Sequence, residues 1–269
     1  MSTATDAQRA LTTRLREVLA ADERIESAWL SGSFGRGAGD AWSDIDVVTV
    51  VAEEDRPHCV AEYAGARNPV GETVLLMSLY GRIASAVRPD WERYDILFVT
   101  PQEFRAYDRA TLRPLAPESL DAPPSPSPPP KPYQPSPDVL VGMVREFLRT
   151  LGLAPTAVER GEWLAGQEGV WLLRKAVIEM MFEANGVGRA ERGGAKRLNA
   201  YLTAEQRTAL EAIPQPGANR AELLAAERAL AGLFLPIAKD TLARAGAPWP
   251  QALEDATRQH LQRTLDLRF

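Results

Sequence analysis

The sequence has very few residues that could form cross-links or bind transition metals. Its 269 residues include one cysteine, Cys59, and two histidines, His58 and His260. A single cysteine excludes an internal disulfide and a thiolate zinc cluster. Two histidines give little support to a histidine-based metal site, so any metal is expected to be held by hard oxygen ligands, for which Mg²⁺ is the natural ion.

The sequence also lacks long apolar runs and an excess of basic charge. No segment approaches the roughly 20 uninterrupted apolar residues of a membrane span, and residues 1–6 do not resemble a signal sequence, so we expect a cytoplasmic protein without a membrane partner. The formal net charge is −5 and the isoelectric point is near 5.3. This balance disfavours a nucleic-acid partner and favours a small neutral or cationic substrate.

Two carboxylates follow a Gly-Ser turn in the first quarter of the chain. Leu30-Ser31-Gly32-Ser33 is separated by ten residues from Asp44-Ile45-Asp46-Val47, and we predict strands over residues 28–30 and 47–50. Residues i and i+2 of a strand point to the same face, so Asp44 and Asp46 are expected to project together. Like charges held this close repel unless a cation lies between them.

The turn itself has features that suit an anionic phosphate. Gly32 has no Cβ and lets the backbone approach closely, while Ser33 adds a hydroxyl donor; taken alone, the pair is also compatible with an ordinary turn. Arg36, in a glycine-flanked loop, either pairs with phosphate oxygens or faces water. Together with the two carboxylates, the turn predicts a site for chemistry on a nucleoside triphosphate.

This arrangement resembles the nucleotidyltransferase superfamily typified by DNA polymerase β, whose pattern is hydrophobic-Gly-Ser, a short gap, then Asp-hydrophobic-Asp/Glu-hydrophobic. Residues 21–51 look like the small antibiotic-modifying branch, the lincosamide and aminoglycoside nucleotidyltransferases. Ser31 departs from the pattern, because a hydrophobic residue is commoner there, but the backbone makes the turn. The resemblance implies transfer of a nucleoside monophosphate, AMP from ATP or from another nucleoside triphosphate, to a hydroxyl of a small molecule, with these antibiotics as suggested acceptors.

The resembled family has a third carboxylate on a later strand, and Asp95 fits that position. It opens the apolar run Ile96-Leu97-Phe98-Val99, where an acid is costly to bury without a cation or a hydrogen-bond partner. The alternative is that Asp95 caps the strand in solvent. The resemblance implies that Asp44, Asp46 and Asp95 hold two Mg²⁺ ions, with Asp95 as a metal ligand or as the general base for the acceptor hydroxyl.

A proline-rich stretch divides the chain. Nine of the fifteen residues 123–137 are proline, which excludes helix and sheet there and predicts a linker over residues 119–137; a PxxP-type ligand is the alternative.

We predict an α+β architecture, with a catalytic α/β domain and a small mixed sheet over 1–118, and an all-α helical bundle over 138–269 that closes over the nucleotide. Helices are expected at about 5–20, 54–66, 139–151 with Asp138 as cap, 156–184, 204–213, 219–245 and 250–266, and further strands at 72–79 and 94–99.

Charged side chains of the predicted bundle offer further candidates. The resemblance implies a helical-domain cation at the triphosphate, and Lys196 in its glycine-rich loop matches best, whereas Arg174 and Lys175 are equally compatible with a solvated helix face. Acids and indoles near the start of the 156–184 helix suit an amine-bearing ligand. The alternative is that the tryptophans belong to the core and the acids are the favourable acids of a first helical turn. The residues in question are Glu159, Glu162, Glu168, Trp163 and Trp171.

Two other functions are compatible with the same motif. One is a transferase that modifies protein or extends nucleic acid, which the acidic balance disfavours. The other is a regulatory protein without turnover, such as a toxin–antitoxin partner or a nucleotide sensor. Because decayed versions usually lose a carboxylate and all three positions are filled here, catalysis is the favoured interpretation.

Overall fold

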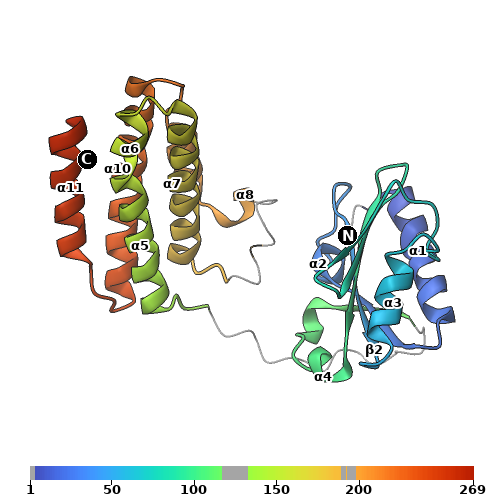
Figure 1. Cartoon of the computed structure of the whole chain (residues 1–269). Helices are drawn as coiled ribbons and strands as arrows, with labels where there is room; N and C mark the ends of the chain where they lie inside the picture. The colour runs from blue at the N-terminus through green and yellow to red at the C-terminus, as the bar shows by residue number, and fades with distance from the viewer. Residues whose placement is uncertain (1–3, 117–132, 189–191, 193–197) are drawn as a thin grey trace. The chain divides into compact units, whose positions relative to one another are not determined.

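The protein is described by a computed structural model, which defines residues 4–116, 133–188, 192 and 198–269. Contacts between Cα atoms divide the chain into two compact units, Met1–Pro130 and Lys131–Phe269 (Figure 1). The first unit contains a mixed six-stranded sheet with helices, and the second is helical. The predicted α+β fold class is therefore confirmed.

The N-terminal unit is built around one sheet with the strand order β3-β4-β5-β2-β1-β6. Strands β2 and β5 run parallel, and the other neighbouring strands of the sheet run antiparallel. In chain order the elements are α1 (Asp6–Ala21), β1 (Ile25–Leu30), α2 (Gly32–Gly35), β2 (Ile45–Val51), α3 (Arg56–Tyr63), β3 (Leu75–Leu79), β4 (Ile83–Val87), β5 (Arg93–Val99), α4 (Pro101–Phe104), the 3₁₀ helix η1 (Arg109–Thr111) and β6 (Arg113–Ala116).

The two faces of this sheet carry separate apolar clusters. The apolar stripe of α1, which includes Leu11 and Leu15, packs on one face together with α3. On the other face, Val48 and Val99 pack with Trp29 in a smaller cluster that α4 completes. Along β5 the side chains alternate between the two clusters, as the two-residue period of a strand requires.

Strands β4 and β6 are absent from the sequence-based prediction. The residues of β4, Ile-Ala-Ser-Ala-Val, include two alanines and a serine, which have weak strand propensity, and β6 contains Pro114. Pro114 is tolerated because β6 is the last strand of the sheet. Neighbouring strands, rather than local propensity, therefore hold these two segments in the sheet.

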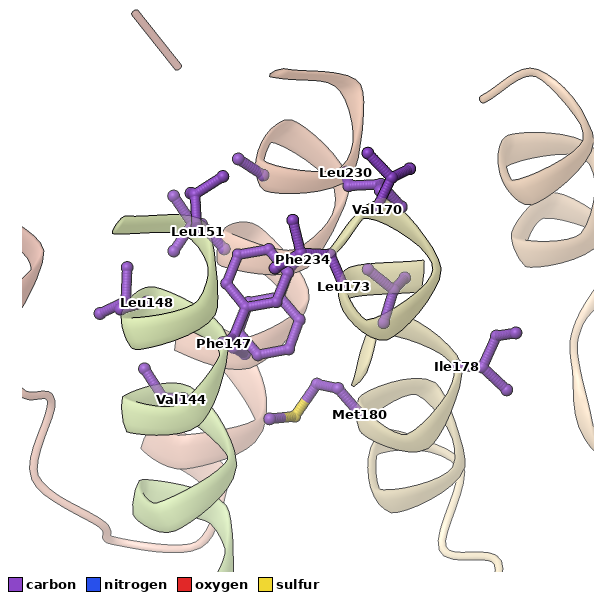
Figure 2. Packing of buried hydrophobic residues seen from close by; sticks show 14 of the residues in the cluster. Val144, Phe147, Leu148, Leu151, Val170, Leu173, Ile178, Met180, Leu230 and Phe234 are labelled. Carbon is purple, nitrogen blue, oxygen red and sulfur yellow. The ribbon is translucent and has the colours of Figure 1, made fainter. Parts of the chain in front are cut away.

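The C-terminal unit is a helical bundle whose core is formed mainly by α5, α7 and α10. At its centre the rings of Phe147 and Phe234 stack with centroids 3.8 Å apart and planes 4° from parallel (Figure 2). The helices are α5 (Pro137–Gly152), α6 (Ala154–Val158), α7 (Trp163–Ala184), α8 (Leu198–Tyr201), α9 (Ala204–Glu211), α10 (Arg220–Arg244) and α11 (Gln251–Leu265).

The bundle differs from prediction at two helix starts. The single helix predicted over 156–184 is wrong: α6 and α7 are separated by a turn at Gly161, whose φ of +69° a helix cannot accommodate. Asp138 is not the cap of α5, because Ser136 occupies that position and Pro137 the first helical one. The end of α7 at Ala184, with Asn185 as its C-cap, is as predicted.

The chain around the proline-rich stretch is described only in part. Residues 117–132, and with them most of the predicted linker, lie outside the described residues. The hydroxyl of Tyr133 donates a 2.7 Å hydrogen bond to the buried carboxylate of Glu183 on α7. Among the helices that the structure describes, none is long and apolar enough to cross a bilayer.

Candidate active site

Gly32 lies directly against the carboxylate of Asp46. Gly32 follows β1 with a φ of +56°, and the Ser31 N–H beside it donates a 2.8 Å hydrogen bond to the Asp46 carbonyl oxygen. An ideal Cβ at residue 32 would lie 1.9 Å from Asp46 Oδ2, closer than atoms can approach. The turn therefore requires glycine for two reasons, its left-handed backbone and its contact with this carboxylate.

Ser33 presents a hydroxyl that has no partner among the residues that the structure describes. Its Oγ is buried and makes no hydrogen bond to any described residue. A buried polar atom without a partner is destabilising, so such an atom beside a glycine turn points to a ligand or water as its partner. Arg36, two residues beyond the buried Phe34, is exposed at the end of α2.

Asp46 and Asp95 are neighbours across the parallel pair of strands. In the register of β2 and β5 their Cα atoms are partners, and Ser85 of β4 is the next residue in the same row. Partners on adjacent strands point to the same face, about 5 Å apart. Asp44 immediately precedes β2, and all three aspartates are half-buried. The fold thus places Asp46 and Asp95 side by side at one end of the central strands, with Asp44 one residue before β2.

The loop that carries Asp44 is fixed by two side chains that sequence reasoning did not single out. Gln8 of α1 is 1 % exposed, and its Nε2 donates hydrogen bonds to the carbonyl oxygens of Asp40 and Ser43, at 3.0 and 2.8 Å. From β5, Arg93 donates a 3.0 Å bond to the Trp42 carbonyl oxygen. The sequence signal that could have identified Gln8 is its position three residues before Leu11, which places a polar side chain on the apolar stripe of α1.

The described residues contain no group of three or more His, Cys, Asp or Glu side chains arranged to hold a metal ion. The acids nevertheless suit a hard cation, because they supply oxygen ligands from two adjacent strands. Lys196, the predicted phosphate-binding cation of the bundle, lies outside the described residues. Cys59 is buried in the sheet core, where burial raises the pKa of its thiol to about 11, so it is an inert packing residue.

The candidate side chains of the bundle do not form one cluster. Glu159 pairs with Arg220 at 2.6 Å, and Arg174 lies over the half-exposed ring of Trp171. Trp163 packs against the bundle core. Glu162 and Glu168 instead line a cavity of the helical unit together with a carboxylate that sequence reasoning missed, Glu227.

Comparison with known proteins identifies the N-terminal unit. Residues 13–113 match the family model of the nucleotidyltransferase domain, which confirms the resemblance predicted from the motif. Among solved structures, the chain is similar to an aminoglycoside 6-adenyltransferase from Bacillus subtilis, with 14% identity, a TM-score of 0.46, and coverage of 93% of this chain and 95% of that chain. No curated protein matches the chain significantly.

Proposed function

We propose that this chain, whose residues 13–113 form a nucleotidyltransferase domain, transfers AMP from ATP to a hydroxyl of a small molecule. The observation that supports this most directly is the register that pairs Asp46 with Asp95, beside the Gly32 turn. It brings acidic oxygens and a phosphate-compatible turn to one end of the sheet. Phosphoryl transfer requires little beyond such positioning and charge stabilisation.

The site residues fit divalent ions, with Mg²⁺ as the proposed ion. Asp44 and Asp46 would hold them, and Asp95 would share one of them or accept the proton of the acceptor hydroxyl. Bound ions would neutralise charge on the triphosphate and polarise the acceptor oxygen. The Gly32 backbone and the Ser33 hydroxyl would hold phosphate oxygens, so that the α-phosphorus faces the attacking oxygen. Arg36 and Lys196 are proposed as further phosphate contacts.

The proposed acceptor is a small hydroxyl compound, with aminoglycosides and lincosamides as the first classes to test. The motif over residues 21–51 supports this choice, because it resembles the branch that modifies these antibiotics. The net charge of −5 also suits a cationic acceptor better than a polyanion.

The test is an assay of the full chain with labelled ATP, Mg²⁺ and a panel of aminoglycosides and lincosamides. Mass spectrometry would detect an acceptor heavier by one nucleotide, together with released pyrophosphate. We expect Asp46→Asn to abolish the transfer. If no acceptor became heavier by one nucleotide, the antibiotic assignment would be removed. Full turnover by Asp46→Asn would overturn the role given to the carboxylates.

A matched control is available on the same unit. Asp90 lies in the turn between β4 and β5, where its Oδ1 accepts a hydrogen bond from the Glu92 N–H, and Asp90→Asn keeps that acceptor. We expect Asp90→Asn to retain full activity. Far-UV circular dichroism of both variants would show that any difference between them is chemical rather than a loss of fold.

A further inference from the structure

The helical unit contains a cavity of about 600 Å³ that the nucleotidyltransferase motif does not use. It lies where the C-terminal end of α5, the short helix α6 and the first turns of α7 meet α10. Its walls are mainly apolar and include Leu153, Ala157, Leu172 and Leu173. Leu173 also belongs to the buried core of the bundle and is labelled in Figure 2 below Val170.

One buried carboxyl group faces this apolar space. Glu227 of α10 lines the cavity, is 3 % exposed, and its Oε2 has no hydrogen-bond partner among the described residues. Burial raises the pKa of this carboxyl to about 8, because the surrounding apolar side chains cannot solvate a charge. A leucine or methionine of similar size would avoid that cost, so the unpartnered carboxyl points to a ligand or water as its partner.

The rim of the cavity does not favour ligands of either charge. The lining includes two cations, Arg149 of α5 and Arg160 of the α6–α7 turn, and two anions, Glu162 and Glu168. Arg149 is already engaged by Glu146 at 2.6 Å. The only titratable side chain deep in the described cavity is therefore Glu227, and an acid there selects a hydrogen-bond donor or a cation.

We propose that this cavity binds a small, mainly apolar molecule that carries one amine, and that Glu227 recognises the amine. The apolar walls would bury the body of the ligand, and the ammonium would supply the partner that Oε2 lacks. A polyhydroxylated ligand is disfavoured, because the walls offer few groups to replace its hydrogen bonds to water. This proposal is independent of the transfer reaction, since it concerns binding to the helical unit alone.

Binding would move one proton. The free carboxyl is mostly protonated at pH 7, and the ammonium is already charged, so Glu227 would ionise as the pair forms and release its proton to the buffer. A neutral alcohol of the same shape would cause no such release. Proton release therefore separates recognition by Glu227 from simple filling of an apolar cavity.

The experiment is isothermal titration calorimetry of the full chain with 4-phenylbutylamine and with its neutral counterpart 4-phenylbutan-1-ol, at pH 7 in buffers of different ionisation enthalpy. We expect the amine to bind with release of close to one proton. Glu227→Gln should weaken amine binding at least tenfold, abolish the proton release and leave binding of the alcohol within twofold. Asp240→Asn is a matched control at the exposed end of the same helix, and it should leave the binding of both probes and the proton release unchanged.

A second variant tests the location. Gly169 of α7 lines the cavity, and an ideal Cβ there meets no atom within 4 Å, so Gly169→Leu can fill the space without disturbing the helix. We expect Gly169→Leu to weaken the binding of both probes at least tenfold. The proposal would be overturned if the wild-type chain bound neither probe, if Glu227→Gln kept full amine affinity, or if Gly169→Leu bound both probes normally.

Discussion

The two units of this protein place acidic side chains in opposite surroundings. In the N-terminal unit, Asp46 and Asp95 are half-buried partners at the end of adjacent strands. In the C-terminal unit, Glu227 is enclosed by apolar side chains and its Oε2 has no described partner. Half-buried acids placed side by side suit cations and phosphate chemistry, whereas an acid whose pKa is raised by burial suits recognition of a single donor.

The largest expected effect concerns the paired acids of the N-terminal unit. Asp95→Asn keeps the shape of the side chain but removes the oxygen charge proposed to bind an ion or accept a proton. We expect kcat to fall by about 10³-fold, equivalent to about 4 kcal/mol of transition-state stabilisation, with the midpoint of thermal unfolding unchanged within a few degrees. Steady-state kinetics of pyrophosphate release would measure it, and a loss below threefold would remove Asp95 from the mechanism.

The next effect concerns the neutral acid and its dependence on pH. The pKa of Glu227 is raised to about 8 in the folded chain from an ordinary value near 4.5, so its contribution to stability is fully present below 4.5 and is lost as the pH rises toward 8. Relative to Glu227→Gln, the wild type should lose on the order of 4 kcal/mol in free energy of unfolding between pH 5 and pH 8.

Urea unfolding of both proteins at the two pH values, followed by far-UV circular dichroism, would measure this difference. Parallel pH dependence of the two proteins would show that Glu227 is charged in the folded state. The contrast between the two units would then disappear.

A smaller effect is expected when the contact between Gly32 and Asp46 is disturbed by substitution of the glycine. Gly32→Ala combines an unfavourable left-handed backbone with a Cβ that would displace the Asp46 carboxylate. Gly81→Ala is a matched control, because Gly81 has a similar φ of +64° but open space around its Cβ. We expect Gly32→Ala to cost about 2 kcal/mol of stability, against about 1 kcal/mol for Gly81→Ala.

Activity should separate these two glycine variants more sharply than stability. We expect kcat/KM for ATP to fall at least tenfold in Gly32→Ala and by less than twofold in Gly81→Ala. Equal kinetics of the two variants would argue against any role of the Gly32 turn beyond folding.

The smallest effect concerns the support of the Asp44 loop. Gln8→Glu retains an acceptor but replaces the Nε2 donor by an oxygen facing two carbonyl groups. We expect a loss of about 1 to 2 kcal/mol in stability and a several-fold rise in KM for ATP. Glu17→Gln, on an exposed position of the same helix, should stay within 0.5 kcal/mol of wild type. Unchanged kinetics in Gln8→Glu would show that the loop keeps its position without this support.

Local sequence patterns predicted the elements whose residues share one consistent signal. The apolar stripe of α1 and the Asn219-capped α10 are both found close to their predicted positions. The failures came where tertiary context overrides local preference, as in β4 with its small residues, or where one glycine, Gly161, interrupts an otherwise helical pattern.

The sequence by itself determined the order of the two units and the glycine turn followed by its acids, because these depend on short-range spacing and composition. Tertiary structure alone decided that Asp95 pairs in register with Asp46, that Gln8 holds a loop more than thirty residues away, and that Glu227 is buried. Strand register and burial depend on which distant segments pack together, and the free energy of that packing is not encoded in any one stretch of chain.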